Sequence, residues 1–335
     1  MLYPLVKKLL FQLEPERAHA LSLSGLRHLQ QSGLLALMYS SRPSPVTLMG
    51  LQFPNRVGIA AGLDKNAVCI DALSALGAGC VEVGTVTPRP QAGNPKPRIF
   101  RLPQAQALIN RMGFPNAGMD AIVARLAVRR SQGICGVNIG KNASTPLEQA
   151  TQDYLSCLRT MAPYADYIAV NVSSPNTVGL RSLQAAAQLR PLLLALLDER
   201  ARLLPTLGRP LPMVVKIAPD LSDDDLNSVA DLLLELGVDG VIATNTTLSR
   251  PVGLGSMGGQ TGGLSGRPVH VLSLATVSKL RLRMGKDFPI IGVGGISSAT
   301  EAVAMRQAGA DLIQIYTGLI YRGPGLISEV AAALA

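Results

Sequence analysis

The sequence YIAVNVSSPN at residues 167–176 contains the pattern that decides the fold. Its first half, Tyr167–Val172, is apolar and partly β-branched, and it lacks the polar alternation of a strand with one face in water. Such a run predicts a strand buried on both faces, as in a parallel sheet covered by helices. Because polar residues follow at once, we expect hydrophilic side chains at the carboxyl end of this strand.

Similar runs recur along the chain and are separated by stretches of helical periodicity. They predict further strands at Val57–Ala61, Cys80–Gly84, Cys135–Ile139, Met213–Ala218, Gly240–Thr244, Pro289–Val293 and Leu312–Tyr316. Eight strands that alternate with helices indicate an α/β fold, a closed (β/α)8 TIM barrel. The chain has 335 residues, 47% of them hydrophobic, which suffices for one such barrel.

Two segments depart from this alternation. The long stretch between the second and third strands contains Pro- and Gly-rich turns, an extended segment at Arg98–Leu102 and a predicted helix at Asn116–Arg130. We interpret it as an insertion over the mouth of the barrel. Val46–Phe53 predicts a hairpin that closes the opposite end.

Residues 1–42 form a helical N-terminal segment distinct from the barrel of residues 43–335. Tyr3–Leu13 and Pro15–Gln31 predict two short helices, and further apolar residues follow at Leu34, Leu35, Leu37 and Met38. The two acidic residues Glu14 and Glu16 are outnumbered by the basic residues Lys7, Lys8, Arg17, Arg27 and Arg42. Such a segment fits a membrane interface, although a helical cap packed on the barrel explains the same pattern.

Composition excludes several classes of function. The net charge of +9 suits anionic ligands or membranes, but there is no dense Lys/Arg run and no Trp for base stacking, so we expect no nucleic-acid partner. No signal peptide and no apolar run long enough to cross a bilayer is present. Three scattered histidines, and cysteines without a CxxC pair, predict reduced buried thiols and no metal site.

Polar residues stand at the carboxyl ends of most predicted strands, where the active sites of these barrels lie. They include Lys65, Thr85, Asn138, Asn171, Ser174, Lys216, Thr244, Asn245 and Thr246. Asparagines and lysines suit a planar ligand rich in carbonyls and ring nitrogens, together with a carboxylate. Glycines that follow strands seven and eight, Gly294-Gly295 and Gly318, suit a phosphate held by backbone N–H groups. The combination indicates flavin mononucleotide (FMN) and an anionic, amide-like substrate.

Each element also has a simpler structural explanation. Gly294-Gly295 fits an ordinary tight turn, and Ser173-Ser174-Pro175 fits a turn or a helix cap. Lys216 could point outward between helices, whereas an unpaired lysine facing inward is costly to bury. The occurrence of all these residues at one end of the strands favours a functional site.

The chain resembles the class 2 dihydroorotate dehydrogenases from its N-terminal helices to its last strand. The motifs that carry the resemblance are AAGLDK at 60–65, GTVTPRPQAGNPKPR at 84–98, NRMGFPN at 110–116, NIGKN at 138–142, NVSSPNTVGLR at 171–181, VKIAPDL at 215–221, TNTT at 244–247, QTGGLSGRP at 260–268, GVGGI at 292–296 and IYTG at 315–318. Val178 departs from the family pattern, in which proline follows SSPNT.

The resemblance implies a flavoprotein oxidoreductase that converts (S)-dihydroorotate to orotate in pyrimidine (UMP) biosynthesis. FMN would accept the hydride and a membrane quinone would accept the electrons. The implied cofactor-binding residues are Ala61, Gly62, Leu63, Asp64, Lys65, Thr85, Asn138, Asn171, Lys216, Thr244, Gly266, Gly295, Tyr316 and Thr317. The implied substrate-binding residues are Lys65, Asn110, Arg111, Met112, Gly113, Phe114, Asn171, Asn176, Asn245 and Thr246.

By the same resemblance, Ser174 is the catalytic base. Class 1 enzymes carry a cysteine in the corresponding loop, and none of the four cysteines here lies there. The implied quinone-site residues are His19, Arg101 and Tyr316. The implied location is peripheral, on the cytoplasmic face of the cell membrane.

Two other functions remain open on the sequence. One is a class 1-type FMN-dependent dihydropyrimidine oxidoreductase, which lacks the helical N-terminal extension. The other is a non-catalytic, membrane-peripheral barrel that binds a phosphate ligand and needs neither Ser174 nor Lys216.

Overall fold

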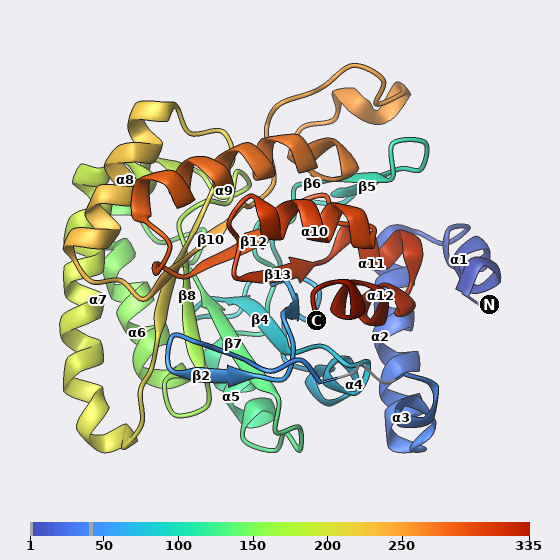
Figure 1. Ribbon diagram of the computed structural model, residues 1–335, viewed down its shortest axis with the longest axis horizontal. Helices are drawn as coiled ribbons and strands as arrows, with labels where there is room; N and C mark the ends of the chain where they lie inside the picture. Colours follow the sequence, from blue (N-terminus) through green and yellow to red (C-terminus); the bar gives the residue numbers. More distant parts are fainter. Residues whose placement is uncertain (1–2, 40–42) are drawn as a thin grey trace.

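A computed structural model describes residues 3–39 and 43–335 and contains a closed barrel of parallel strands in the order β10-β12-β13-β3-β4-β7-β8-β9 (Figure 1). The strands are β3 (Val57–Ile59), β4 (Cys80–Val86), β7 (Ile134–Ile139), β8 (Tyr167–Asn171), β9 (Met213–Ile217), β10 (Gly240–Ala243), β12 (Ile290–Val293) and β13 (Leu312–Ile315). Every predicted barrel strand is present, with ends shifted by one to two residues. The predicted TIM barrel is confirmed.

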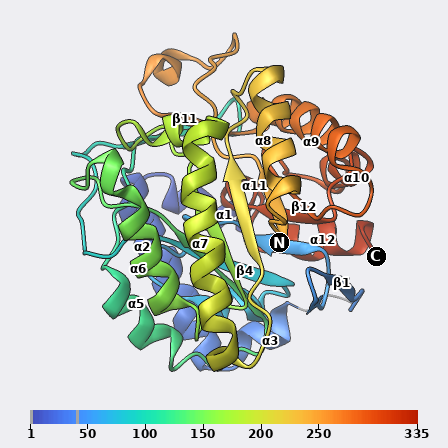
Figure 2. The same ribbon diagram turned by 90° about the vertical axis from the view of Figure 1, so that its left-hand side faces the viewer.

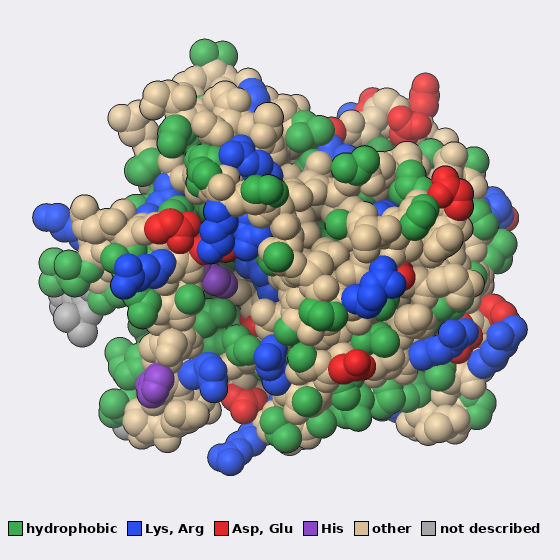
Figure 3. All heavy atoms as spheres, turned by 180° about the vertical axis from the view of Figure 1, so that it is seen from behind, with side chains coloured by type: hydrophobic (Ala, Val, Ile, Leu, Met, Phe, Trp, Pro, Cys, Tyr) green, Lys and Arg blue, Asp and Glu red, His purple; other side chains and the backbone are tan. Residues whose placement is uncertain are grey.

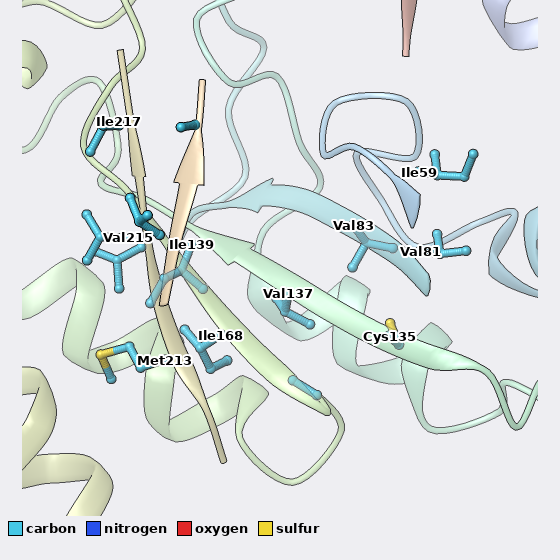
Figure 4. Close-up of a cluster of buried hydrophobic side chains, with 14 of the residues drawn as sticks. Ile59, Val81, Val83, Cys135, Val137, Ile139, Ile168, Met213, Val215 and Ile217 are labelled. Atoms are coloured by element: carbon cyan, nitrogen blue, oxygen red, sulfur yellow. The ribbon is translucent and has the colours of Figure 1, made fainter. Parts of the chain in front are cut away.

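Side-chain alternation along the strands divides the barrel wall into two surfaces. Val83, Val137, Ile168 and Val215 belong to the main core, between strands and surrounding helices, as Figure 4 shows. The helices are α4 (Ile70–Ala75), α5 (Met119–Leu126), α6 (Ala150–Met161), α7 (Ala186–Leu207), α8 (Asp223–Glu235), α9 (His270–Met284), α10 (Ala299–Gln307) and α12 (Gly325–Ala333). Helices α6, α7 and α8 lie outside the strands in Figure 2. The residues that alternate with them along the strands, such as Glu82 and Lys216, therefore face the barrel interior.

A hairpin closes the amino-terminal end of the barrel. Its strands β1 (Val46–Leu48) and β2 (Leu51–Phe53) pair antiparallel, as the sequence predicted. Phe53 is fully buried against the first residues of the strands, including Cys80 and Tyr167. The interior of this end is filled by apolar side chains.

A small antiparallel sheet lies over the carboxyl ends of the strands. It joins β5 (Ile99–Leu102), β6 (Ala107–Asn110) and β11 (Gly263–Gly266) in the order β11-β6-β5. The sequence predicted the extended segment at β5 but not β6 or β11, because β11 is half glycine and β6 has no clear alternation. Helix α5 is shorter than the predicted Asn116–Arg130, since Gly118 with φ of 80° delays its start.

The N-terminal segment packs along the outside of the barrel, beside α4 and the C-terminal helices (Figure 1). Helix α1 (Tyr3–Leu10) ends before the predicted Leu13, and α2 (Pro15–Gln31) begins where Glu14 accepts hydrogen bonds from the backbone N–H groups of residues 16 and 17. A third helix, α3 (Leu34–Met38), was not predicted. Leu23 and Leu35 join the main core, so α2 and α3 act as a cap on the barrel.

Among residues 3–39 and 43–335, no helix is both long and apolar enough to span a bilayer. The predicted basic residue Arg42 lies outside the described residues.

Candidate active site

A cavity of about 1200 Å³, including its mouth, opens at the carboxyl ends of the strands. Polar lining comes from Lys65, Thr85, Asn110, Asn171, Ser174, Asn176, Lys216, Thr244, Asn245, Thr246, Ser265, Gln314, Tyr316 and Thr317. Apolar and glycine lining comes from Ala60, Ala61, Gly62, Met112, Gly113, Phe114, Val269, Gly294, Gly295 and Ile296, among others. The small β5-β6-β11 sheet supplies one wall.

Three side chains from neighbouring strands form a buried polar cluster at the cavity wall. Thr85 donates to Asn138 Oδ1 at 2.5 Å, while Asn171 Nδ2 donates to Thr85 Oγ1 at 2.9 Å and to Asn138 Oδ1 at 3.1 Å. Asn138 is fully buried behind the other two. The cluster fixes the orientation of the Asn171 amide, which lines the cavity.

Ser174 lies in the loop after β8 and lines the cavity with 5% of its surface exposed. Its hydroxyl oxygen accepts a hydrogen bond from the backbone N–H of Asn176 at 3.2 Å, and Asn176 Nδ2 donates to Asn110 Oδ1 at 3.2 Å. On the other side, Asn245 Nδ2 donates to Ser173 Oγ at 3.0 Å. The amides and Ser174 thus converge from β6, the β8 loop and the β10 loop.

Arg181 and Asp220 tie two of these loops together. Arg181 donates from Nε to the Ser173 carbonyl at 3.1 Å and from Nη2 to the Thr246 carbonyl at 2.8 Å. Its Nη1 pairs with Asp220 at 2.7 Å, and Asp220 also accepts from Thr247 Oγ1. Neither residue lines the cavity, and the pair was not predicted from the sequence.

Two lysines bring positive charge to the cavity. Lys65 Nζ donates to the Gly62 carbonyl at 2.7 Å, and burial lowers the pKa of Lys65 to about 8. Lys216 is 5% exposed and faces inward, which resolves the choice left open by the sequence. Burial lowers the pKa of Lys216, and the neighbouring Glu82 carboxylate opposes that shift.

Glycines and a helix start bound the far end of the cavity. Gly266 and Gly295 have positive φ angles of 94° and 68°. A Cβ at Gly295 would lie 2.6 Å from His270 Cβ, and one at Gly266 would lie 3.0 Å from Thr317 Cγ2. Only glycine allows this close approach. Thr317 starts α11 (Thr317–Arg322) and donates to Ser265 Oγ at 2.9 Å. The arrangement matches a phosphate cradle.

Four of the predicted cofactor and substrate residues do not line the cavity. Leu63 belongs to the core, and Asn138 lies behind Thr85 and Asn171. Asp64 is fully buried and accepts from the backbone N–H groups of Val68 and Cys69 at 2.9 and 2.6 Å, so it shapes the loop after β3. Arg111 stacks over Phe100 and donates to the loop at Thr261.

The three predicted quinone residues come from three elements: one lies on α2, one on β5 and one directly after β13. Tyr316 lines the cavity and donates to the Gly62 carbonyl at 3.2 Å. His19 on α2 is half-buried beside the Leu63 backbone, and burial lowers its pKa to about 4, so its ring is neutral near pH 7. Arg101 binds the Leu13 carbonyl at 2.7 Å and stacks over Phe11. His19 and Arg101 thus lie near the cavity but do not line it.

Sequence reasoning missed Glu82 and Gln314, which face the barrel interior below the cavity. Glu82 is fully buried in the otherwise apolar run CVEVG. The sequence pattern could have predicted Glu82, because it is the one charged residue of an apolar strand, as Lys216 is in VVKIA. Gln314 lines the cavity, and its Oε1 has no hydrogen-bond partner among residues 3–39 and 43–335.

The four cysteines are all buried and unpaired, as predicted. Burial raises the pKa of Cys69 and Cys135 to about 12. In the described part of the chain, no group of three or more His, Cys, Asp or Glu side chains could hold a metal ion.

The comparisons with known proteins agree in one family. A family model described as dihydroorotate dehydrogenase matches residues 44–335. A protein named dihydroorotate dehydrogenase (quinone) from Paraburkholderia phymatum is 55% identical over 336 residues, covering 100% of this chain and 98% of the relative. One of the same name from Marinomonas sp. is 54% identical over 335 residues, covering 99% and 96%. The crystal structure of DHODH in complex with ferulenol from Eimeria tenella superposes with a TM-score of 0.88 at 39% identity, covering 96% of this chain and 90% of that one.

Proposed function

Because the chain belongs to the dihydroorotate dehydrogenase family, we propose that it oxidises dihydroorotate to orotate and passes the electrons to a quinone, a step of pyrimidine biosynthesis. One observation carries the proposal: a single cavity unites Ser174, Lys65, Lys216 and a set of asparagine amides. This set suits a planar, amide-rich carboxylate beside a redox cofactor. The family implies a flavin, and we propose FMN in particular.

Three features of the cavity fit FMN. The glycine cradle at Gly266 and Gly295 offers backbone N–H groups for one phosphate. Gln314 adds an amide side chain to the lining, a group that suits the polar edge of a flavin. Lys216 provides a positive charge beside the space for the ring. When bound, the flavin would supply the hydride acceptor, and Lys216 would stabilise negative charge on the ring.

The substrate would lie against the wall formed by Ser174, Asn176, Asn110 and Asn245. The amides are held by their neighbours, so they are oriented before the substrate arrives. Dihydroorotate carries a carboxylate, for which Lys65 supplies a positive charge below pH 8. We propose that the remaining predicted contacts, including Met112–Phe114, cover the substrate from the side of the inserted segment.

Ser174 would remove the proton from C5 of the substrate. Serine is a weak base, so the proton must move on to a second group. The hydroxyl of Thr177 is buried and has no hydrogen-bond partner among the described residues. It lies three positions after Ser174, and we propose it as the group that takes the proton onward from Ser174.

The N-terminal segment, residues 1–42, would form the membrane and quinone side of the protein, and residues 43–335 the catalytic barrel. Leu5 and Leu9 on α1 are 65% and 72% exposed, and Lys8 beside them is exposed as well. Figure 3 shows hydrophobic side chains on these helices at the left, with Lys and Arg nearby. This surface suits peripheral attachment to the cytoplasmic face of an anionic membrane.

Quinone would then approach between α1–α2 and the barrel. His19, Arg101 and Tyr316 lie along that route and supply a neutral imidazole, a guanidinium and a phenol. Tyr316 also lines the cofactor cavity, so it connects the route to the flavin site.

Anaerobic titration of the purified protein with dihydroorotate tests the proposal. We expect the flavin absorbance to bleach and to return when a quinone is added. The cofactor released by denaturation should have the mass of FMN. A protein that retains flavin but does not bleach with dihydroorotate would contradict the proposed substrate, and release of FAD would contradict the proposed cofactor.

A further inference from the structure

A carboxylate is buried in the barrel interior, where the proposed reaction assigns it no role. Glu82, on β4, is fully buried. Its Oε1 accepts from Asn138 Nδ2 at 2.9 Å, and its Oε2 accepts from Tyr167 Oη at 2.9 Å and from Gln314 Nε2 at 2.8 Å. Burying a carboxylate is costly even with hydrogen bonds, so a purely structural explanation is unsatisfactory.

The interior is shaped to hold this carboxylate. Gly136 on β7 leaves room for the Tyr167 ring, since a Cβ there would lie 2.1 Å from Tyr167 Cζ. Asn138 connects Glu82 to the cavity wall through Thr85 and Asn171. Gln314 connects it to the cavity directly, because Gln314 is itself a lining residue.

The cation nearest to this carboxylate is Lys216. Its Nζ lies 4.0 Å from Glu82 Oε1, and both side chains are buried. Within the described part of the chain, Lys216 Nζ has no hydrogen-bond acceptor, so its N–H groups remain available to a ligand in the cavity. An ammonium buried to this degree loses its proton readily unless an anion lies close by.

We propose that Glu82 is a positioning residue that keeps Lys216 protonated beside the flavin ring. The carboxylate acts through Lys216 and touches neither substrate nor cofactor. Lys216 then carries its positive charge before negative charge develops on the ring, and no proton has to enter the closed site. The inference rests on the proposed flavin site.

The tyrosine and the two cysteines around the pair stay uncharged near neutral pH, whereas Lys65 loses its charge near pH 8. Burial raises the pKa of Tyr167 and Cys80 on β8 and β4, and that of Cys135 on β7 to about 12. Lys65 lines another part of the cavity and is positive below pH 8. Glu82 is therefore the anion that lies next to Lys216 among the described groups.

Sulfite binding to the flavin of the holoenzyme tests the inference without catalysis. Sulfite adds to the ring at N5 and places negative charge on it, so its affinity reports the positive charge nearby. We expect Glu82→Gln to weaken sulfite binding at least tenfold at pH 7.5. Lowering the pH should recover the affinity as Lys216 regains its proton. Lys216→Met should show the same loss without recovery.

Tyr167→Phe is the matched control, because it removes one hydrogen bond to Glu82 and no charge. We expect its sulfite affinity to stay within about threefold of wild type, in line with one hydrogen bond of ~0.5 kcal/mol. Equal or tighter sulfite binding by Glu82→Gln would overturn the inference, because Lys216 would then be charged without its partner. Wild-type protein without flavin absorbance would instead refute the proposed function.

Should Glu82→Gln fail to fold, the wild-type holoenzyme provides the measurement. Lysine labelled with ¹³C at Cε reports the charge of Lys216 by NMR, with Lys216→Arg for assignment. We expect an ammonium from pH 6 to pH 9, and a neutral amine at pH 7 would overturn the inference.

Discussion

The barrel mouth and helix α1 invert the usual distribution of residues in a soluble protein. In the barrel mouth, Asn138, Asn171 and Lys216 are polar and buried. On α1, Leu5 and Leu9 are apolar and exposed, and no residue of that helix is buried. Buried polar groups and exposed apolar patches are the informative exceptions to the hydrophobic rule. The two regions therefore depart from the hydrophobic rule in opposite directions.

The two regions also differ in how firmly neighbours hold their side chains. Asn171 is fixed by Thr85 and Asn138. Helix α1, in contrast, contacts the barrel mainly through Tyr3 and Lys7, which donate to the carbonyls of Ile320 and Tyr321 on α11. A rigid polar site suits chemistry, which needs positions held within fractions of an ångström. A lightly attached apolar helix suits a fluid membrane surface.

The largest effect should follow from removing the base in the rigid region. Ser174→Ala should slow flavin reduction by dihydroorotate about 10²–10⁴-fold, the range for a positioned general base. Flavin content and substrate binding should be retained, because the loop is held by Arg181. Anaerobic stopped-flow measurement of flavin bleaching gives the rate.

Ser173→Ala is the matched control for this prediction. Its hydroxyl donates to Asn171 and accepts from Asn245, but it does not line the cavity. We expect at most about a thirtyfold loss of rate, since the two neutral hydrogen bonds that are lost contribute about 1 kcal/mol each. Equal losses in both variants would mean that the rate depends on the conformation of the loop rather than on the Ser174 hydroxyl.

The second prediction concerns α1. Leu5→Glu and Leu9→Glu should each weaken binding to anionic liposomes about tenfold, because a buried leucine contributes roughly 1.5–3 kcal/mol. The double variant should lose most turnover with long-tailed quinones but retain bleaching by dihydroorotate. Cosedimentation with vesicles and a quinone assay measure the two effects.

Leu282→Glu is the control for exposed leucines, since Leu282 on α9 is 85% exposed but far along the chain from the N-terminal helices. It should bind liposomes like wild type. A deletion of residues 1–42 is a poorer test than these substitutions, because it removes Leu23 and Leu35 from the main core. Wild-type liposome binding by the double variant would exclude α1 as the membrane contact.

The third prediction uses the pKa of Lys65, which burial lowers to about 8. Below that pH the ammonium is charged and attracts the substrate carboxylate; above it the charge is lost. We expect kcat/KM for dihydroorotate to fall by up to about tenfold per pH unit above pH 8. Lys65→Met should have a low kcat/KM without this decline, and a decline that persists in the variant would assign the titration elsewhere.

The barrel was predictable because its signal is repeated and local. Each strand is a continuous apolar run, and eight of them leave little choice of architecture. Strands β6 and β11 were missed because their pairing brings residues 107–110 beside residues 263–266, far away in the sequence. The segment at β11 is half glycine, and its conformation is determined by its partner rather than by its own residues.

Site residues were predictable where they follow a strand. They were not predictable where they hold a loop in place without lining the cavity. Lys65 and Ser174 follow strands directly, so the fold places them at the mouth. Arg181 and Asp220 hold loops from the outside, and no sequence pattern pairs them. Arg111 is the opposite case. Its motif predicts contact with the substrate, but its guanidinium stacks on Phe100.

The smallest expected effect lies at the junction of the two regions, where Glu16 on α2 pairs with Arg98 before β5. Arg98 Nε and Nη2 each lie 2.8 Å from the carboxylate, and this hydrogen bonding lowers the pKa of Glu16. A carboxylate with a lowered pKa stabilises the folded state above its unfolded pKa, and the contribution disappears as the pH falls through the folded value.

Glu16→Gln should therefore cost about 1 kcal/mol at pH 7, a decrease in Tm of about 2 °C, because Arg98 keeps one acceptor but loses its counter-charge. The difference from wild type should shrink as the pH falls through the lowered pKa of Glu16, where the wild-type carboxylate gains its proton. Lys96→Gln is the control, since Lys96 contacts the same carboxylate at 3.4 Å but is 62% exposed, and its Tm should be unchanged. Flavin bleaching by dihydroorotate should be normal in both variants, because the junction holds α2 on the barrel and not the substrate. A Glu16→Gln protein that no longer bleaches would show that the two regions form one site.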